Sequence, residues 1–387
     1  MISAYGEGPL AKPKIVFTAL FLIILLGAGL RLYGIWWGLP TQQQYHKSFH
    51  PDEARKLHAI MGMSLSRLDL NPHWYSKATL QFYVIGAVLK AASVFDVVTL
   101  RGYQFYVEHP TELAKLYLLG RLVTVFMSLL SIFLVFVIGS KLYYRPVGLL
   151  AALLLSVLPS DVINSHYMKA DVPQTFWLLV TVVCAIQIWR SKKRIWYILA
   201  GLATGFATAT KYPAGLAVIL ITVAHLLQIE TKVSPGKLLR SLFNKNLMLG
   251  YIFAVFGFLI GNPYTLAYGE FSQNIRHIFV DSTSLTTTIH PDYDYELDGY
   301  LRGPMWAYYL SHIMHYGMGL PLQIASITSV LFAFIRRWRT DILLLSWVVP
   351  YFLLIGSANY AVVRYLTPLG PFLMIMAFLF DFYVYLE

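Results

Sequence analysis

The chain has 387 residues, of which 57% are hydrophobic and only 13% are charged, and its mean hydropathy is +0.59. This composition excludes an ordinary soluble domain. The apolar residues form continuous runs, which predict an α-helical membrane protein and not a β-barrel. The net charge of +11 does not indicate nucleic-acid binding, because the basic residues form short clusters between apolar runs, as cytoplasmic loops do. The single cysteine, Cys184, lies inside an apolar run, which excludes a disulfide framework.

The first apolar run, residues 15–37, predicts a retained span, since no small-residue cleavage site follows it. Two lysines precede the run, so it should begin inside and end outside. The next run, 80–95, could cross the membrane or lie in the interface. If it crossed, the basic residues at 141–145 and every later basic cluster would face outside. The positive-inside rule therefore favours an interfacial helix over 80–95.

The remaining runs predict spans at about 118–140, 147–159, 172–189, 196–209, 213–228, 247–261, 318–334, 342–357 and 366–385. We expect one transmembrane domain over 1–387, with about ten spans, both ends inside, and no C-terminal soluble domain. Large outer loops should cover 38–116 and 263–317. On this topology the outer side holds the unusual ionisable residues, namely Asp52, Glu53, Lys77, Asp161, His166, Lys169, Asp171, Lys211, Asp292 and Arg364.

The outer stretch at 48–56, SFHPDEARK, places adjacent carboxylates at the start of a short helix. Proline suits the first helical position, and Asp52 and Glu53 suit the first turn. Apolar residues then recur at helical spacing, at 54, 57, 61, 65 and 68, until Asn71-Pro72 ends the pattern. This describes an amphipathic helix in the bilayer interface. The alternative is a surface helix whose acids only cap its own terminus.

A second acid follows in the next outer loop, where Asp171 directly precedes a proline-started span. It could be a helix cap. Against this, His166 and Lys169 stand beside it at a membrane boundary, where ionisable residues are expected to be functional. Lys77 could simply contact lipid headgroups. Arg55 is three residues from Asp52 and should share its helix face.

Two further cations, Lys211 and Arg364, stand at the outer ends of later spans. Together with Arg55 and Lys77 they would suit a lipid-phosphate group at headgroup level. The small residues before Lys211 indicate helix packing rather than a phosphate loop. The sequence contains no Walker loop, dinucleotide fingerprint, H-E-x-x-H motif or G-x-S-x-G elbow. The outer histidines at 50, 58, 166 and 290 match no standard metal-site spacing.

Together these motifs resemble the polytopic GT-C glycosyltransferases, in particular the protein O-mannosyltransferase-like family 39 and its aminoarabinose-transferase relatives. The resemblance covers most of the chain from the first span onward. It rests on HPDEAR at 50–55, Asn71-Pro72 with Lys77, YMKAD at 167–171, the small-residue run 201–212, and RYLTPLGP at 364–371. Two features depart from the family: many relatives carry a soluble outer domain, and many have an arginine where this chain has His166 and Lys169.

The resemblance implies a GT-C fold, with two juxtamembrane helices in the first outer loop. It also implies an inverting transfer of a sugar from a polyprenyl-phosphate donor to a hydroxyl of a protein, lipid or glycan acceptor. Asp52 would be the general base, with Glu53 as its rival, and Asp171 would orient the acceptor or Asp52. Phosphate contacts would come from Arg55, Lys77, His166, Lys169, Lys211 and Arg364. The resemblance fixes no cofactor, and a divalent metal held by Asp52, Asp171 and a histidine stays open.

Two other functional classes remain as alternatives. A transporter or flippase of a lipid-linked or anionic substrate could use the same outer cations, but it would more often show paired repeats with broken helices at mid-membrane depth. A structural membrane subunit would leave the one-sided cluster without a purpose. We expect a multi-pass protein of a prokaryotic plasma membrane with an extracytoplasmic active site. The sugar, the acceptor, the lipid length and the oligomeric state do not follow from the sequence.

Overall fold

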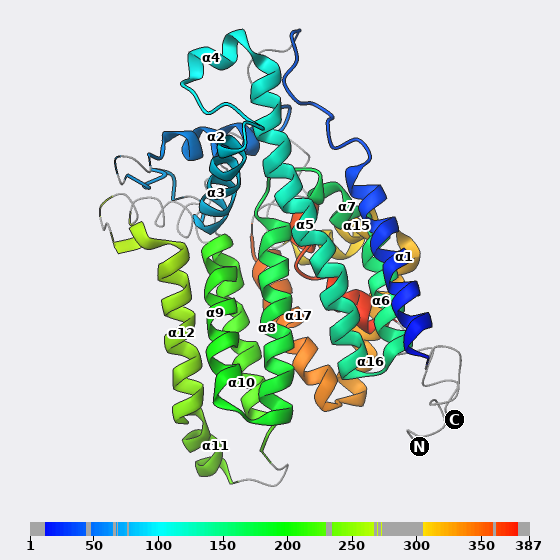
Figure 1. The fold of residues 1–387 in the computed structure, drawn as a ribbon. Coiled ribbons are helices and arrows are strands. Elements are labelled where there is room, and N and C mark those ends of the chain that lie inside the picture. Colours follow the sequence, from blue (N-terminus) through cyan, green and yellow to red (C-terminus); the bar gives the residue numbers. More distant parts are fainter. Residues whose placement is uncertain are drawn as a thin grey trace.

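The computed structural model describes residues 12–43, 48–64, 67, 69–75, 77–229, 234–266, 269, 272, 305–358 and 361–377. Within these residues the regular elements are helices, and an isolated antiparallel bridge joins Ser64 to Asp69. Figure 1 shows a helical bundle with α2 (Pro51–Gly62), α3 (Leu80–Val94) and α4 (Tyr103–Glu108) at one end. The prediction of an all-α fold is confirmed.

The main helices of the bundle are α1 (Pro13–Leu32), α5 (Pro110–Leu142), α6 (Arg145–Val157), α8 (Asp171–Ser191), α9 (Arg194–Thr210), α10 (Val218–Leu226), α12 (Lys245–Gly261), α16 (Leu320–Arg336) and α17 (Arg339–Gly356). Shorter pieces are α7 (Pro159–Ser165), η3 (Tyr212–Ala217), α11 (Pro235–Leu242), η4 (Pro263–Leu266), α14 (Trp306–Tyr308), η7 (Tyr309–Ile313), α15 (Met314–Met318), η8 (Val363–Leu366) and α18 (Gly370–Met376). We call α2, α3 and α4 the stacked helices.

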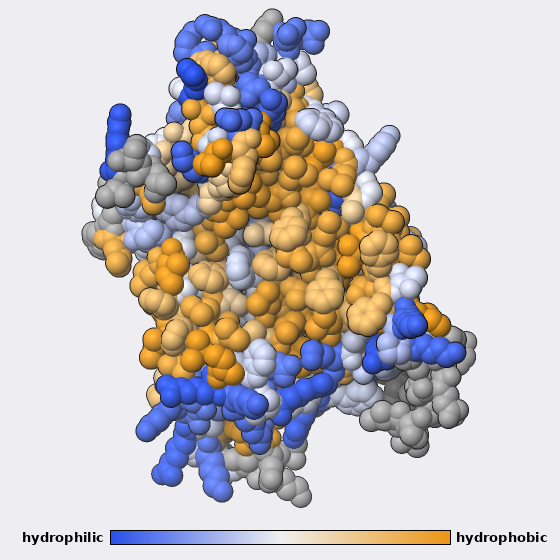
Figure 2. All heavy atoms as spheres, in the orientation of Figure 1, coloured by the Kyte–Doolittle hydropathy of each residue, from blue (hydrophilic) through white to orange (hydrophobic). Residues whose placement is uncertain are grey.

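The bundle carries the apolar surface expected of an integral membrane protein. Five helical stretches are long and apolar enough to cross a bilayer, and the bent pair α6–α7 makes a sixth within the described residues. Three shorter apolar stretches, α3, η3–α10 and α16, fall below that length. The predicted number of about ten spans is therefore not confirmed. Figure 2 shows the apolar side chains as a belt between two polar ends.

The two polar ends differ in character. Basic residues mark the junction of α5 and α6 at 141–145, the turn between α8 and α9 at 190–194, and the amphipathic α11. In Figure 1 α11 and the α8–α9 turn lie at the opposite end of the bundle from α2, α3 and α4. The alternation of helix direction thus brings these basic clusters to one end, as the positive-inside pattern predicts.

The stacked helices cover the other end. In Figure 1 α3 lies beyond the ends of α9 and α12 rather than beside them. The Thr79 hydroxyl, just before α3, donates to the Gly261 carbonyl at the end of α12, 2.9 Å away. This position supports the prediction that 80–95 does not cross. The helix predicted from Asp52 to about residue 70 is shorter than expected, because α2 ends at Gly62 and the chain turns into the Ser64–Asp69 bridge. Positions 65 and 68 lie outside the described residues.

Small residues set the contact between α9 and α12. A Cβ on Gly201 would lie 2.2 Å from the Gly250 carbonyl oxygen, and one on Gly205 would lie 2.4 Å from the Ala254 carbonyl oxygen. Only glycine allows the two backbones to approach so closely. The small-residue run before Lys211 is thus a packing surface, as the sequence indicated.

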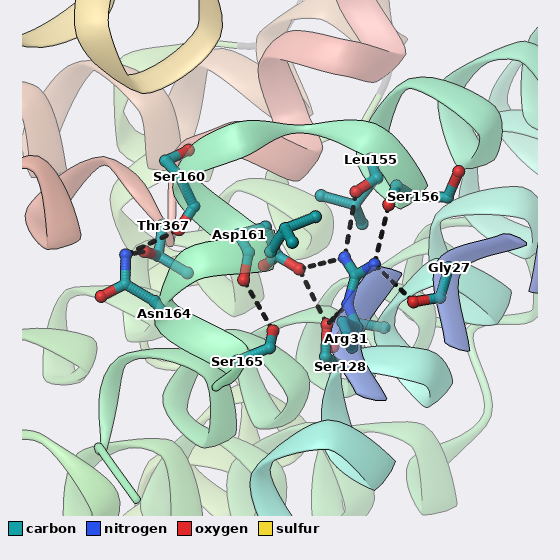
Figure 3. A network of polar contacts seen from close by, with 12 residues as sticks. Gly27, Arg31, Ser128, Leu155, Ser156, Ser160, Asp161, Asn164, Ser165 and Thr367 are labelled. Atoms are coloured by element: carbon teal, nitrogen blue, oxygen red, sulfur yellow. Dashed lines mark hydrogen bonds and ion pairs between the residues drawn. The ribbon is translucent and has the colours of Figure 1, made fainter. Parts of the chain in front are cut away.

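A buried arginine joins four elements of the bundle (Figure 3). Pro159 has no N–H for the Leu155 carbonyl, and the α6–α7 axis bends by 57° there. Arg31 of α1 donates to the Leu155 and Ser156 carbonyls at 3.2 and 2.7 Å. It also bonds Asp161 of α7 at 2.6 Å, and its remaining donors reach the Ser128 hydroxyl and the Gly27 carbonyl. All five guanidinium hydrogens therefore have acceptors in a site with no solvent exposure.

Candidate active site

The first turn of α2 separates the adjacent carboxylates, because neighbouring helix residues point about 100° apart. Pro51 begins the helix, and the His50 ring nitrogen accepts the Asp52 N–H at 3.2 Å as its cap. Glu53 turns inward and has no exposed surface. Its two carboxylate oxygens accept from the Arg121 guanidinium at 2.9 and 2.7 Å. The Ser48 hydroxyl and the Met168 N–H complete the set at 2.6 and 2.7 Å. Glu53 is thus held as a structural anion, and no lone pair is left for a substrate proton.

A second buried residue of α2 continues this contact with the 168–169 backbone. Lys56 is 3% exposed, and its amine donates to the Gln81 side-chain oxygen and to the Met168 carbonyl, the latter at 2.8 Å. The Gln81 amide in turn donates to the Lys169 carbonyl at 2.7 Å. Burial lowers the pKa of Lys56 to about 7, although the negative charge of Asp52 partly offsets this by raising the pKa. Both bonds survive this titration, because a neutral amine still has two hydrogens to donate. We call Glu53, Lys56 and Gln81 the backbone clamp.

The clamp fixes the chain that carries Lys169 and Asp171 against the helix that carries Asp52. Lys169 is 9% exposed, and its amine lies 5.1 Å from the centre of the Tyr167 ring. Burial and the neighbouring Arg364 lower the pKa of Lys169 to about 8. The amine is therefore charged at neutral pH and titrates just above it.

Asp52 is the carboxylate that stays accessible, with 27% of its side chain exposed. The Arg364 guanidinium lies 3.6 Å from its Oδ2, which is an ion-pair distance but longer than a direct hydrogen bond. Burial raises the pKa of Asp52, but the charges of Lys77 and Arg364 outweigh it, and the net shift is downward from 3.8. Burial also lowers the pKa of Lys77, while the Asp52 charge opposes that shift. Asp52 is thus an ionised carboxylate with cations around it.

Asp171 lies at the start of α8 and is committed to one partner. Lys211, which follows α9, donates to its Oδ1 at 2.6 Å, and the Asp171 side chain is 5% exposed. The Lys211 amine also stands 4.3 Å from the centre of the Tyr365 ring, beside Arg364. This pair ties the ends of α8, α9 and η8 together.

The structure thus brings six residues to the end of the bundle under α2, which we call the Asp52 cluster. Its members are Asp52, Lys77, Lys169, Asp171, Lys211 and Arg364. Two predicted site residues lie elsewhere. Arg55 is exposed and lines a cavity with Leu57 and His58, and no described carboxylate pairs with it. His166 directs its ring nitrogens to the Val162 and Tyr33 carbonyls, both at 2.8 Å, and so joins α7 to the end of α1. Asp292 and His290 lie outside the described residues.

Three residues of this region were absent from the sequence prediction: Arg121, Lys56 and Gln81. For Arg121 a signal existed, because a charge inside the apolar run 118–140 points to a buried partner. Lys56 and Gln81 gave no such signal, since their pairing depends on how α2 packs against α3.

Among the residues that the structure describes, the donors around Asp52 are not arranged to hold a divalent metal. Within the described residues no group of three His, Cys, Asp or Glu side chains is placed to hold one. Asp171 already bonds Lys211, and the two neighbours that lower the pKa of Asp52 most, Lys77 and Arg364, are cationic. Metal ligation by two carboxylates and a histidine would require these cations to leave.

Comparison with known proteins gives one family match. Residues 99–279 match the family described as dolichyl-phosphate-mannose-protein mannosyltransferase. No curated protein matches the chain.

Solved structures share the fold at low sequence identity. One is the Archaeoglobus fulgidus oligosaccharyltransferase in its apo form, with a TM-score of 0.60 and 12% identity. The match covers 97% of this chain and 52% of the oligosaccharyltransferase chain. The same enzyme in complex with Zn and sulfate gives a TM-score of 0.58 and 12% identity, covering 95% of this chain and 50% of its own.

A third is ArnT from Cupriavidus metallidurans bound to undecaprenyl phosphate, with a TM-score of 0.62 and 15% identity, covering 96% of this chain and 60% of its own. The chain spans about 50–60% of the length of these proteins. It is therefore a GT-C-fold membrane protein whose residues 99–279 match the dolichyl-phosphate-mannose-protein mannosyltransferase family.

Proposed function

We propose that this protein is an inverting glycosyltransferase that moves a sugar from a polyprenyl phosphate to an acceptor hydroxyl. The observation that carries the proposal is the state of Asp52, an accessible, ionised carboxylate surrounded by cations at one end of an apolar bundle. A lipid phosphate reaches such a place from the headgroup layer, and its sugar then lies beside Asp52. The ArnT structure with undecaprenyl phosphate and an archaeal oligosaccharyltransferase with dolichol-phosphate support a lipid phosphate as ligand of this fold.

In this reaction the acceptor oxygen bonds to the anomeric carbon while the bond from that carbon to the phosphate oxygen breaks. Asp52 takes the proton of the acceptor hydroxyl, for which it must be ionised and within hydrogen-bond reach. The released phosphate gains negative charge, which Lys77, Lys169 and Arg364 stabilise. Asp171 and Lys211 hold the ends of α8 and α9 in register around the donor.

A bound phosphate also changes the pKa of Asp52. The charges of Lys77 and Arg364 lower the pKa of Asp52 before the donor binds. Once these cations share their charge with a bound phosphate, they stabilise the Asp52 anion less, and its basicity rises. Donor binding would thus prepare the base for proton transfer.

We place the Asp52 cluster on the extracytoplasmic face of a prokaryotic plasma membrane, because the basic loops lie at the opposite end of the bundle. The acceptor would therefore be a protein, lipid or glycan on that side. We further propose that transfer needs no divalent metal, since cations already occupy the surroundings of both carboxylates.

A transfer assay with purified protein in lipid vesicles tests this function. Radiolabelled polyprenyl-phosphate sugars would be offered with a panel of hydroxyl acceptors, with and without EDTA. We expect transfer with inversion at the anomeric carbon and equal rates in both conditions. Retention of configuration would contradict the mechanism, and loss of transfer in EDTA would contradict its metal independence.

A further inference from the structure

A cavity of about 1040 Å³ lies beside α2, and no member of the Asp52 cluster lines it. Its walls come from α2, the 71–74 segment, residues 101–103 and the outer end of α5. Its volume is at the upper limit of about 300–1,000 Å³ for small-molecule sites. Neither Asp52 nor any residue of the backbone clamp lines it. The proposed transfer step therefore gives this cavity no role.

Two arginines give the cavity its charge. Arg55 of α2 and Arg101 both line it, and in the described part of the chain neither guanidinium pairs with a carboxylate. Arg101 is held beside the Phe105 ring, 5.7 Å from its centre. The described lining contains no acid, and His58 and His73 add further polar edges. A planar guanidinium binds carboxylate or phosphate through two parallel hydrogen bonds.

Aromatic rings stand beside these cations. Trp74 lines the cavity and is stacked on Phe82 with a centroid distance of 5.7 Å and an interplanar angle of 15°, so its ring is fixed in place. Tyr103 also lines the cavity and is 58% exposed. Rigid aromatic faces accept the C–H faces of sugar rings, while guanidinium groups accept their anionic substituents. This pairing of side chains favours a saccharide over a simple anion.

The cavity reaches the first turns of α2. Ala54, two residues after Asp52, belongs to its lining, and two helical residues rise by about 3 Å along the axis. The lining therefore begins within one helical turn of Asp52.

We propose that this cavity is a distal acceptor subsite for an anionic saccharide, a glycan that carries carboxylate or phosphate groups. Arg55 and Arg101 bind the anionic groups, and Trp74 stacks on a sugar ring. Its role as an acceptor subsite rests on the proposed transferase function, whereas saccharide binding itself does not.

Binding is tested without any transfer step. The full chain in nanodiscs, with no donor present, is titrated calorimetrically with tetragalacturonate, neutral maltotetraose and tetraglutamate. We expect tetragalacturonate to bind at least about tenfold tighter than either control probe, because charge and ring stacking act together. Equal binding of tetraglutamate would indicate that the ligand is an acidic peptide and not a saccharide. Absence of tetragalacturonate binding would contradict the proposed subsite.

Variants locate the binding. Arg55→Gln/Arg101→Gln and Trp74→Leu should each weaken tetragalacturonate binding by about tenfold or more. The matched control Arg67→Gln/Lys90→Gln removes two exposed charges outside the lining and should change the Kd by less than about twofold. An equal loss of affinity in the control would show that binding depends on general charge attraction and not on this cavity. Asp52→Asn should bind like the wild type, so a failed transfer assay and a failed subsite give different results.

Discussion

At the scale of single residues, the structure separates two carboxylates that the sequence could not distinguish. Glu53 is enclosed by Arg121, Ser48 and the Met168 N–H, whereas Asp52 keeps 27% of its side chain exposed beside Arg364. A one-residue step along a helix is enough to place one acid in the interior and its neighbour in the site. Sequence reasoning kept both as candidate bases, because only tertiary packing shows which side of α2 is buried.

Lys169 gives the site a pH dependence that can be measured. Its pKa is lowered to about 8 by burial and by Arg364, so the charged form is present below that pH and is lost above it. We expect transfer to decline above about pH 8 as the phosphate loses this cation. Lys169→Arg stays protonated throughout and should remove the alkaline decline in the pH–rate profile. An unchanged decline in this variant would contradict the assignment, and the exposed Lys90→Arg serves as control.

At the scale of elements, the backbone clamp links α2 and α3 to the segment before α8. Glu53, Lys56 and Gln81 bond the backbone at 168–169 from two helices. The order of motifs in the sequence predicted that Asp52 and Asp171 share an outer side, since alternate spans return the chain there. The clamp itself was not predictable, because Lys56 and Gln81 lie in stretches that amphipathicity alone explains. The α2 end at Gly62 was likewise missed, because the apolar spacing continues beyond it.

Gln81 variants separate positioning from folding. Gln81→Glu still accepts a hydrogen bond from Lys56, but its carboxylate cannot donate to the Lys169 carbonyl. We expect a kcat about tenfold lower, because Lys169 is no longer held in place, and a smaller loss of thermal stability than in Gln81→Leu, because the new carboxylate pairs with Lys56. Gln81→Leu should lose both activity and stability, since it leaves the buried Lys56 without that acceptor. Full kcat in Gln81→Glu would show that the clamp has no part in positioning.

At the scale of the whole molecule, the apolar runs and basic loops of the sequence were sufficient to predict an all-helical membrane protein with its ionisable cluster at one end. The number of spans could not be predicted from the sequence, because several apolar helices are short and whether they cross the membrane depends on packing. The interior polar contacts were also beyond sequence reasoning. Arg31 appears in the sequence only as the end of a span, yet it joins α1, α5, α6 and α7 at the Pro159 break.

Arg31→Met tests this joint. The change leaves Asp161 buried and unpaired, which should reduce the stability of the folded protein by about 3–5 kcal/mol. The double variant Arg31→Met/Asp161→Leu removes both charges and should recover part of the loss. Thermal unfolding midpoints in one detergent measure both. A single variant as stable as the wild type would mean that the network does not hold the bundle together.

The role of Asp52 as general base is tested by a comparison of transfer rates. Sugar transfer from a polyprenyl-phosphate donor is measured in lipid vesicles for wild type, Asp52→Asn, and the control Asp69→Asn, an exposed acid of the same outer region. Loss of a general base predicts a fall of about 10²–10⁴-fold in Asp52→Asn with donor binding retained, and an unchanged rate in the control. Transfer by Asp52→Asn at the wild-type rate would contradict the account.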